Sequence, residues 1–176
     1  MSDNEESQLT TVWLCIATSG QTLDGRFIKP EWLFAMAQHY DPAYYTALIW
    51  EEHNRKLDNL GEVLALKIEQ TDGETKLYAR LRPNIKLLQY NAQGQKLFCS
   101  IEVEKDFQGK GIYYLGGLAV TDDPSSVGTN RLDFSINRTH FSRRKRELSL
   151  SSPTAFNLKK GLTQSKNLWF SAISAG

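Results

Sequence analysis

Residues 60–69, LGEVLALKIE, and residues 75–81, TKLYARL, flank the turn Thr71-Asp72-Gly73 and form the most regular pattern of the chain. Apolar side chains recur at alternate positions in both runs, as they do along strands that are buried on one face. Asp-Gly is a common pair in tight hairpin turns. The stretch therefore predicts an antiparallel hairpin, around which the other elements have to be arranged.

Working outward, the chain offers further strands and two short helices. Apolar and β-branched runs predict strands over residues 11–17, 46–51, 96–105 and 112–121. Pro30 suits the first turn of a helix that runs to about Tyr40, before Asp41-Pro42 ends it. A second helix is expected over residues 84–92, ended by Gly94. About six strands and two short helices predict an α+β fold with a closed or strongly curved antiparallel sheet.

Composition limits the class of protein. The chain has 176 residues, of which 40% are hydrophobic and 23% charged, and its net charge is +1. These values suit one globular domain and give no reason to expect nucleic acid or an anionic membrane as the main partner. No apolar run approaches the roughly 18 residues that span a bilayer. The acidic start, residues 1–8, does not resemble a secretory signal, and we expect residues 1–10 to be flexible.

The two cysteines, Cys15 and Cys99, both lie in apolar stretches. Two cysteines are too few for a disulfide framework or a zinc site, so we expect reduced thiols in the core. No cluster of metal ligands is visible in the sequence. We therefore expect neither a metal nor a cofactor.

The character of the chain changes after Phe134. Polar and basic residues dominate there, and apolar residues become scattered. We expect a domain over residues 11–134 and a linker or tail over residues 135–176. The basic cluster of residues 143–146 fits a solvated charge run, with a docking site for an acidic partner or nucleic acid as the alternative.

Six motifs follow one another along the chain in a fixed order. They are Asp24-Gly25-Arg26-Phe27-Ile28, Tyr40-Asp41-Pro42-Ala43-Tyr44-Tyr45, Ile49-Trp50-Glu51-Glu52-His53, Leu60-Gly61-Glu62-Val63, Phe98-Cys99-Ser100-Ile101-Glu102-Val103 and Leu115-Gly116-Gly117-Leu118-Ala119-Val120-Thr121-Asp122-Asp123-Pro124. In these motifs, from about residue 12 to residue 134, the sequence resembles the GPO family, the capsid scaffolding proteins and maturation serine proteases of tailed bacteriophages.

The resemblance implies a fold and a catalytic triad. The implied fold is that of the herpesvirus assembly proteases, a β-barrel flanked by helices. Matched motif by motif, Asp24 is the implied acid, His53 the general base and Ser100 the nucleophile. Such a triad needs no metal, because the imidazole takes the serine proton and the acid holds the imidazole.

The residues taken alone leave alternatives to each assignment. Ser100 by itself is a small residue in mid-strand, without the Gly-x-Ser-x-Gly elbow of other hydrolases. Cys99 is a rival nucleophile, although strand alternation turns it to the opposite face. His39 in the first helix and His140 in the tail are rivals of His53, and neither lies in a matching motif.

The acid and the oxyanion hole are the most open assignments. Asp24 precedes a glycine and also fits an ordinary turn. Asp122 and Asp123 are alternatives, whereas Glu51 and Glu52 adjoin His53 in poor geometry. Gly116-Gly117 and the loop over residues 124–128 are candidates for donating backbone N–H groups to an oxyanion, and tight packing or a turn explains them equally well.

The resemblance implies a serine endopeptidase that cuts the phage major capsid protein, the portal protein and itself. It would work in the cytoplasm of the bacterial host and inside the assembling procapsid, with possible self-association. Self-cleavage is expected in the tail, for example at Ala155 or within residues 171–176. The long helical scaffolding region of the family is not evident before Gly176, so the resemblance supports the protease half. The alternatives are a non-catalytic assembly module with a vestigial site and a cysteine hydrolase that uses Cys99.

Overall fold

The computed structural model describes residues 9–134 and 141–142. They form ten strands and two α-helices, with a short 3₁₀ turn at Phe107–Gly109. The strands are β1 (Thr10–Thr11), β2 (Leu14–Thr18), β3 (Gly20–Gln21), β4 (Phe27–Ile28), β5 (Ile49–Glu51), β6 (Gly61–Thr71), β7 (Glu74–Pro83), β8 (Phe98–Glu104), β9 (Tyr114–Thr121) and β10 (Phe141–Ser142). The helices are α1 (Pro30–His39) and α2 (Ile85–Ala92). The expected α+β class is confirmed.

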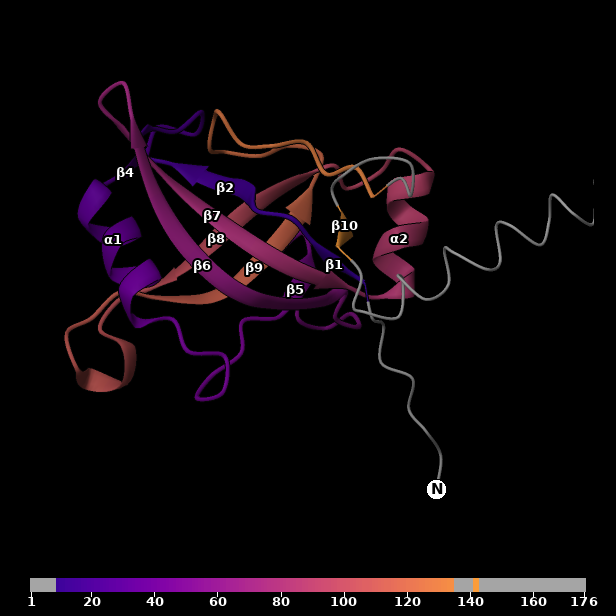
Figure 1. The fold of residues 1–176 in the computed structure, drawn as a ribbon, viewed down its shortest axis with the longest axis horizontal. Helices are drawn as coiled ribbons and strands as arrows, with labels where there is room; N and C mark the ends of the chain where they lie inside the picture. Colours follow the sequence, from indigo (N-terminus) through magenta and orange to yellow (C-terminus); the bar gives the residue numbers. More distant parts are fainter. Residues whose placement is uncertain (1–8, 135–140, 143–176) are drawn as a thin grey trace, which may run out of the picture. The chain divides into compact units, whose positions relative to one another are not determined.

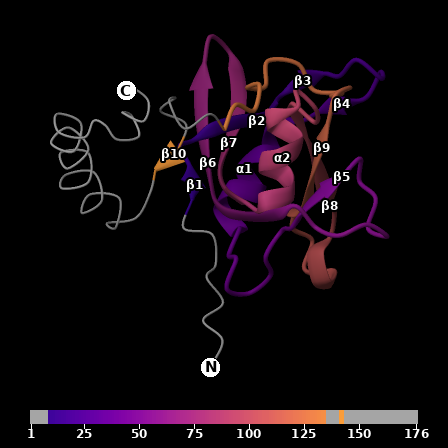
Figure 2. The ribbon, with the colours of Figure 1, turned by 90° about the vertical axis from the view of Figure 1, so that its right-hand side faces the viewer.

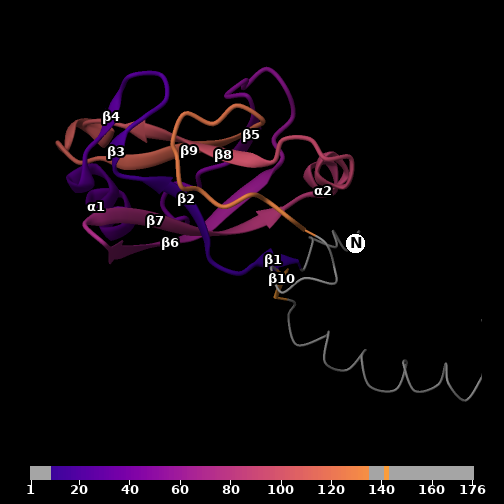
Figure 3. The same cartoon turned by 90° about the horizontal axis from the view of Figure 1, so that it is seen from above.

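Two three-stranded sheets form the body of the domain, with strand orders β2-β7-β6 and β5-β9-β8. Seen from above, they lie as two layers that share one hydrophobic core (Figure 3). The fully buried side chains Ile16, Leu81 and Leu118 come from both sheets. Two smaller pairings, β1-β10 and β3-β4, complete the described strands.

The predicted hairpin is the longest antiparallel pairing. β6 and β7 pair from Gly61↔Pro83 to Thr71↔Glu74, and the turn residues Asp72 and Gly73 have φ values of 52° and 81°. Two successive positive φ values are typical of a type I′ turn, whose twist matches that of the flanking strands. The hairpin is confirmed and runs further toward the turn than the sequence indicated.

The two helices lie at opposite ends of the sheets (Figures 1 and 2). Helix α1 begins with Pro30 at its first position and buries Leu33 and Met36. Helix α2 begins after Asn84, whose side-chain oxygen accepts hydrogen bonds from the N–H groups of residues 86 and 87. Both helices confirm the sequence prediction, since proline and asparagine are favoured at these positions.

The expected closed barrel is the main correction to the predicted fold. On one side the two sheets meet through a single bridge, Leu48↔Glu62. On the other side, β2 and β8 are the outer strands of their sheets, and no ladder joins them within the described chain. The segment around Asn130 and Leu132 lies in that opening instead, where it bonds to Cys15 of β2 and to Leu97. Among the described residues, one edge of β8 therefore has no strand partner.

Other details also differ from the sequence prediction. The strand expected at residues 11–17 is divided into β1 and β2, and the one expected at 46–51 is reduced to β5. β5 pairs with β9 in parallel, an exception in a mostly antiparallel fold. The short β3-β4 and β1-β10 pairings were not predicted. The linker or tail expected at residues 135–176 lies outside the described residues, apart from β10.

Within the described residues, neither helix has the length and apolar character needed to cross a membrane.

Candidate active site

His53 lies in a tight turn directly after β5. Glu52 and His53 have φ values of 49° and 60°, a left-handed conformation that is uncommon for residues other than glycine. Two contacts of the Glu52 carboxylate hold the turn: Thr121 Oγ1 donates to it at 2.8 Å and Lys96 Nζ at 2.9 Å. The backbone at His53 is thus fixed in a costly conformation, as is frequent at functional sites.

Ser100 lies near the middle of β8, opposite Ala119 of β9, and is 9% exposed. Its neighbour Cys99 is 1% exposed and belongs to the core. Burial raises the pKa of the Cys99 thiol to about 12. Strand alternation therefore does separate the two side chains, and only Ser100 reaches the surface side of the strand.

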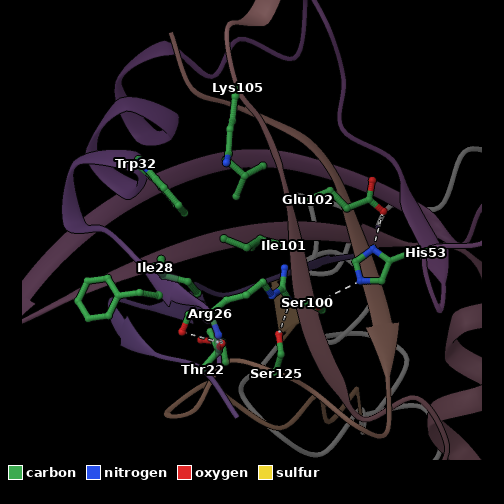
Figure 4. Close-up of a pocket in the computed structure, with 13 residues that line it drawn as sticks. Thr22, Arg26, Ile28, Trp32, His53, Ser100, Ile101, Glu102, Lys105 and Ser125 are labelled. Atoms are coloured by element: carbon green, nitrogen blue, oxygen red, sulfur yellow. Dashed lines mark hydrogen bonds and ion pairs between the residues drawn. The ribbon is translucent and has the colours of Figure 1, made fainter. Parts of the chain in front are cut away.

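The structure brings Ser100 and His53 together. His53 Nε2 is 3.2 Å from Ser100 Oγ, and His53 Nδ1 is 2.8 Å from Oε1 of Glu102 (Figure 4). An ionised carboxylate can only accept hydrogen bonds, so Nδ1 carries the ring proton and donates it to Glu102. In the neutral ring, Nε2 is then the acceptor, and the Ser100 hydroxyl donates to it. This is the protonation pattern that a general base needs.

Glu102 reaches His53 because it lies two residues after Ser100, on the same face of β8. Its second oxygen, Oε2, accepts a hydrogen bond from Arg55 Nη2 at 2.5 Å. Burial by itself raises the pKa of Glu102, but the hydrogen bonds from His53 and Arg55 outweigh it and lower the pKa below its usual value. The Glu102 side chain is 17% exposed. Sequence reasoning missed this residue, although the i, i+2 spacing from Ser100 indicated a shared face.

The structure does not bring Asp24 to His53. Oδ2 of Asp24 accepts two hydrogen bonds from Arg26, from Nε at 2.9 Å and from Nη2 at 2.6 Å. Oδ1 accepts a hydrogen bond from Thr22 Oγ1 at 2.5 Å. The hydrogen bonds from Arg26 and Thr22 lower the pKa of Asp24 well below its usual range. Its carboxylate is engaged within its own loop, where Arg26 also donates to Ser125 Oγ at 3.2 Å.

The carboxylates of Asp122 and Glu51 are engaged elsewhere, and Asp123 lies in a turn. Asp122 accepts a hydrogen bond from the N–H of Leu97 at 3.0 Å. Asp123 lies in the turn after β9, where its N–H donates to Thr121 Oγ1. Glu51 accepts a hydrogen bond from the hydroxyl of Tyr90 at 2.7 Å.

The two rival histidines are not part of this arrangement. His39 is exposed in the last turn of α1. His140 lies outside the described residues.

The candidate oxyanion glycines lie in the central strand β9. Gly117 faces Glu102 in the register, and a Cβ atom there would lie 2.5 Å from Glu102 Oε2 and 2.8 Å from Arg55 Nη2. Because strand N–H groups point toward neighbouring strands rather than out of the sheet, this clearance is the better explanation of Gly117. A Cβ at Gly116 would make only ordinary contacts, with Glu104. The other oxyanion candidate, the loop over residues 124–128, contributes Ser125 and Ser126 to the cleft wall.

Ser100 and His53 open into a cleft of about 660 Å³. Four consecutive residues of β8, from Ser100 to Val103, line it, so the cleft follows the open edge of that strand. The opposite wall is formed by the β3-β4 region and by Trp32, while Lys105 adds a positive charge (Figure 4). Within the described residues, no three or more His, Cys, Asp or Glu side chains gather in a group suited to a metal ion.

Comparisons with known proteins place these observations in a family. The family model described as "GPO serine peptidase, N-terminal domain" matches residues 11–137. The chain is also 36% identical over 137 residues to the "Capsid assembly scaffolding protein" of Escherichia phage P2. That alignment covers 71% of this chain and 48% of the relative, so the chain spans about half the length of the relative it matches. No solved structure gives a significant match.

Proposed function

The chain belongs to the GPO serine peptidase family, and from that premise we propose that it is a serine endopeptidase with Ser100 as nucleophile and His53 as general base. The observation that carries the proposal is the 3.2 Å contact between Ser100 Oγ and His53 Nε2, made by a ring whose other nitrogen donates to a carboxylate. A serine hydroxyl is a weak nucleophile until such a base removes its proton.

The geometry supports the following sequence of steps. Ser100 Oγ attacks the scissile carbonyl carbon while its proton passes to His53 Nε2, and the carbonyl electrons move onto the oxygen. Collapse of this tetrahedral intermediate breaks the C–N bond, and the imidazolium protonates the leaving amine. Water then attacks the resulting ester with His53 again as base, which releases the carboxylic acid and restores Ser100. Substrate would lie extended along the open edge of β8, where backbone groups are available for pairing.

The proposed substrates are inferred from the name of the relative. Since the P2 protein is a capsid assembly scaffolding protein, we propose that this chain cuts phage capsid assembly proteins, namely the major capsid and portal proteins, and also itself. The places of action would be the cytoplasm of the bacterial host and the assembling procapsid. Self-cleavage sites in residues 135–176 remain a prediction, since they fall outside the described region.

Intact-mass spectrometry of the full chain tests the proposal. The purified protein and its Ser100→Ala variant are incubated alone and with the capsid protein of phage P2, and a fluorophosphonate is added in parallel as a probe for an activated serine. We expect Ser100-dependent cleavage and a single phosphonyl adduct on Ser100. Uncut proteins and no adduct would favour the non-catalytic assembly module, and inhibition by a thiol reagent alone would favour Cys99.

A further inference from the structure

Glu102 has two partners that fix it from opposite sides. One carboxylate oxygen accepts from His53 Nδ1 at 2.8 Å, and the other accepts from Arg55 Nη2 at 2.5 Å. Glu102 comes from β8, whereas His53 and Arg55 come from the turn after β5. The carboxylate therefore ties the turn that carries the base to the strand that carries the nucleophile.

We propose that Glu102, held by Arg55 and given room by Gly117, is the acid that positions His53, in the place that the family resemblance assigns to Asp24. The inference rests on the proposed function, because it names the third member of the same site. Glu102 is a positioning residue: it touches neither the substrate nor the reacting atoms, and it acts through the tautomer and orientation of the imidazole.

Arg55 determines which way the acid presents its oxygens. Arginine is only a donor, so whichever atom of residue 102 faces Arg55 has to be an acceptor. The Arg55 guanidinium also lies 5.2 Å from the ring centre of Trp50, which restricts its movement. Because Arg55 only donates and is held in place, residue 102 has to present an oxygen atom to it.

Gly117 supplies the space for this arrangement. Any side chain there would place its Cβ only 2.5 Å from Glu102 Oε2 and 2.8 Å from Arg55 Nη2, closer than real Cβ contacts come. Gly117 lies opposite Glu102 in the β8-β9 register, so the contact cannot be relieved by sliding one strand. Residue 117 therefore has to be a glycine for the Glu102 carboxylate to lie between Arg55 and His53 as it does.

The role of Arg55 gives the replacement of Glu102 by glutamine an unusual consequence. The amide oxygen of Gln has to face Arg55, so its NH₂ group faces His53 Nδ1. That group donates, which makes Nδ1 the acceptor and moves the ring proton to Nε2. Nε2 then can no longer take the proton of Ser100. We expect this variant to be no more active than Glu102→Ala, even though glutamine matches glutamate in size.

The experiment compares five full-length proteins: wild type, Glu102→Gln, Glu102→Ala, Arg55→Ala and the double variant Glu102→Gln/Arg55→Ala. The first readout is the rate of fluorophosphonate labelling at Ser100 as a function of pH. The second is the ¹⁵N NMR spectrum of the imidazoles, which distinguishes the two neutral tautomers and is simple in a chain with three histidines. Glu69→Gln is the matched control, because it changes a remote exposed carboxylate that pairs with Lys67.

The expected labelling rate of Glu102→Gln is lower than wild type by roughly 10²- to 10⁴-fold, with the His53 proton moved to Nε2. Glu69→Gln stays at the wild-type rate. Removing Arg55 in the double variant frees the amide to rotate, so part of the rate and the Nδ1–H tautomer return. This gain cannot come from a misfolded protein.

Two results would overturn the inference while leaving the proposed function intact. The first is a Glu102→Gln variant that is labelled at the wild-type rate and keeps the ring proton of His53 on Nδ1. The second is a double variant whose labelling rate is no higher than that of Glu102→Gln. Loss of the proposed function looks different: Ser100 in the wild-type protein would then not be labelled at all.

Discussion

Two arginine–carboxylate pairs lie beside the same cleft, and they do different things. Asp24 and Arg26 belong to one loop, and their side chains are 46% and 70% exposed. Glu102 and Arg55 come from different elements, and the Glu102 side chain is only 17% exposed. The first pair shapes the cleft wall through Ser125, whereas the second contacts the base. The acid that contacts His53 is therefore better identified by its place on the same strand face as Ser100 than by its place in a family motif.

The largest expected effect comes from removing the group that the Glu102 pair holds. His53→Ala should lower the rate of fluorophosphonate labelling at Ser100 by on the order of 10⁴-fold, because the hydroxyl loses its proton acceptor. The half-exposed position of His53 predicts little change in melting temperature. Labelling at more than a tenth of the wild-type rate would contradict the assignment of His53 as base.

Gly117→Ala should have the next largest effect. The new methyl group overlaps the ends of the Glu102 and Arg55 side chains and forces them to move, so we expect the fluorophosphonate labelling rate to fall. The free energy of unfolding should change by no more than about 1 kcal/mol, because these flexible ends can give way and only their ion pair is weakened. The unfolding energy is measured by urea titration. Gly116→Ala is the matched control, since a Cβ there makes only ordinary contacts. Equal effects of the two variants would argue against a specific clearance at Gly117.

Asp24→Asn should have a smaller effect on activity. Asparagine keeps an acceptor for Thr22 but weakens the pairing with Arg26, so the cleft wall loosens while His53 keeps its partner. For cleavage of the capsid protein, we expect KM to change by less than about 10-fold and kcat to stay the same. The substitution affects substrate binding at the cleft wall and not the chemical step. A large loss of kcat here would return the role of the acid to Asp24.

The smallest expected effect concerns stability at low pH. The pKa of Glu102 is lower in the folded protein than in the unfolded chain, so its ionised form stabilises the fold. This contribution is present above the unfolded-state value of about 4.3 and is lost as the pH falls through the folded-state pKa. Thermal melts of wild type and Glu102→Gln from pH 7 down to pH 3 should therefore converge. A difference that stays constant over this range would indicate that Glu102 does not titrate with folding.

Local sequence patterns predicted most helices and strands of this fold. They could not predict whether strands that are distant in the sequence pair and close a barrel. The Asp72-Gly73 turn and the Asn84 cap are decided by neighbouring residues, so both could be inferred from the sequence. Whether β2 pairs with β8 depends on the segment at residues 130–132, which is far away in the chain. The same holds for the parallel pairing of β5 with β9.

The candidate site follows the same division. Motifs pointed to His53 and Ser100, which the fold does bring together. Glu102 lay within a quoted motif but had no assigned role, because only the folded chain shows that the turn after β5 comes to lie over β8. Asp24 was the acid that the resemblance implied, and its pairing with Arg26 is a local contact that spacing alone does not reveal.

The most direct test of this account is a side-by-side measurement of the fluorophosphonate labelling rate in Glu102→Gln and Asp24→Asn, both in the full-length chain. The account predicts that Glu102→Gln is slower than wild type by roughly 10²-fold or more, whereas Asp24→Asn stays within about 10-fold of wild type. The reverse order would contradict it and would assign the positioning of His53 to Asp24.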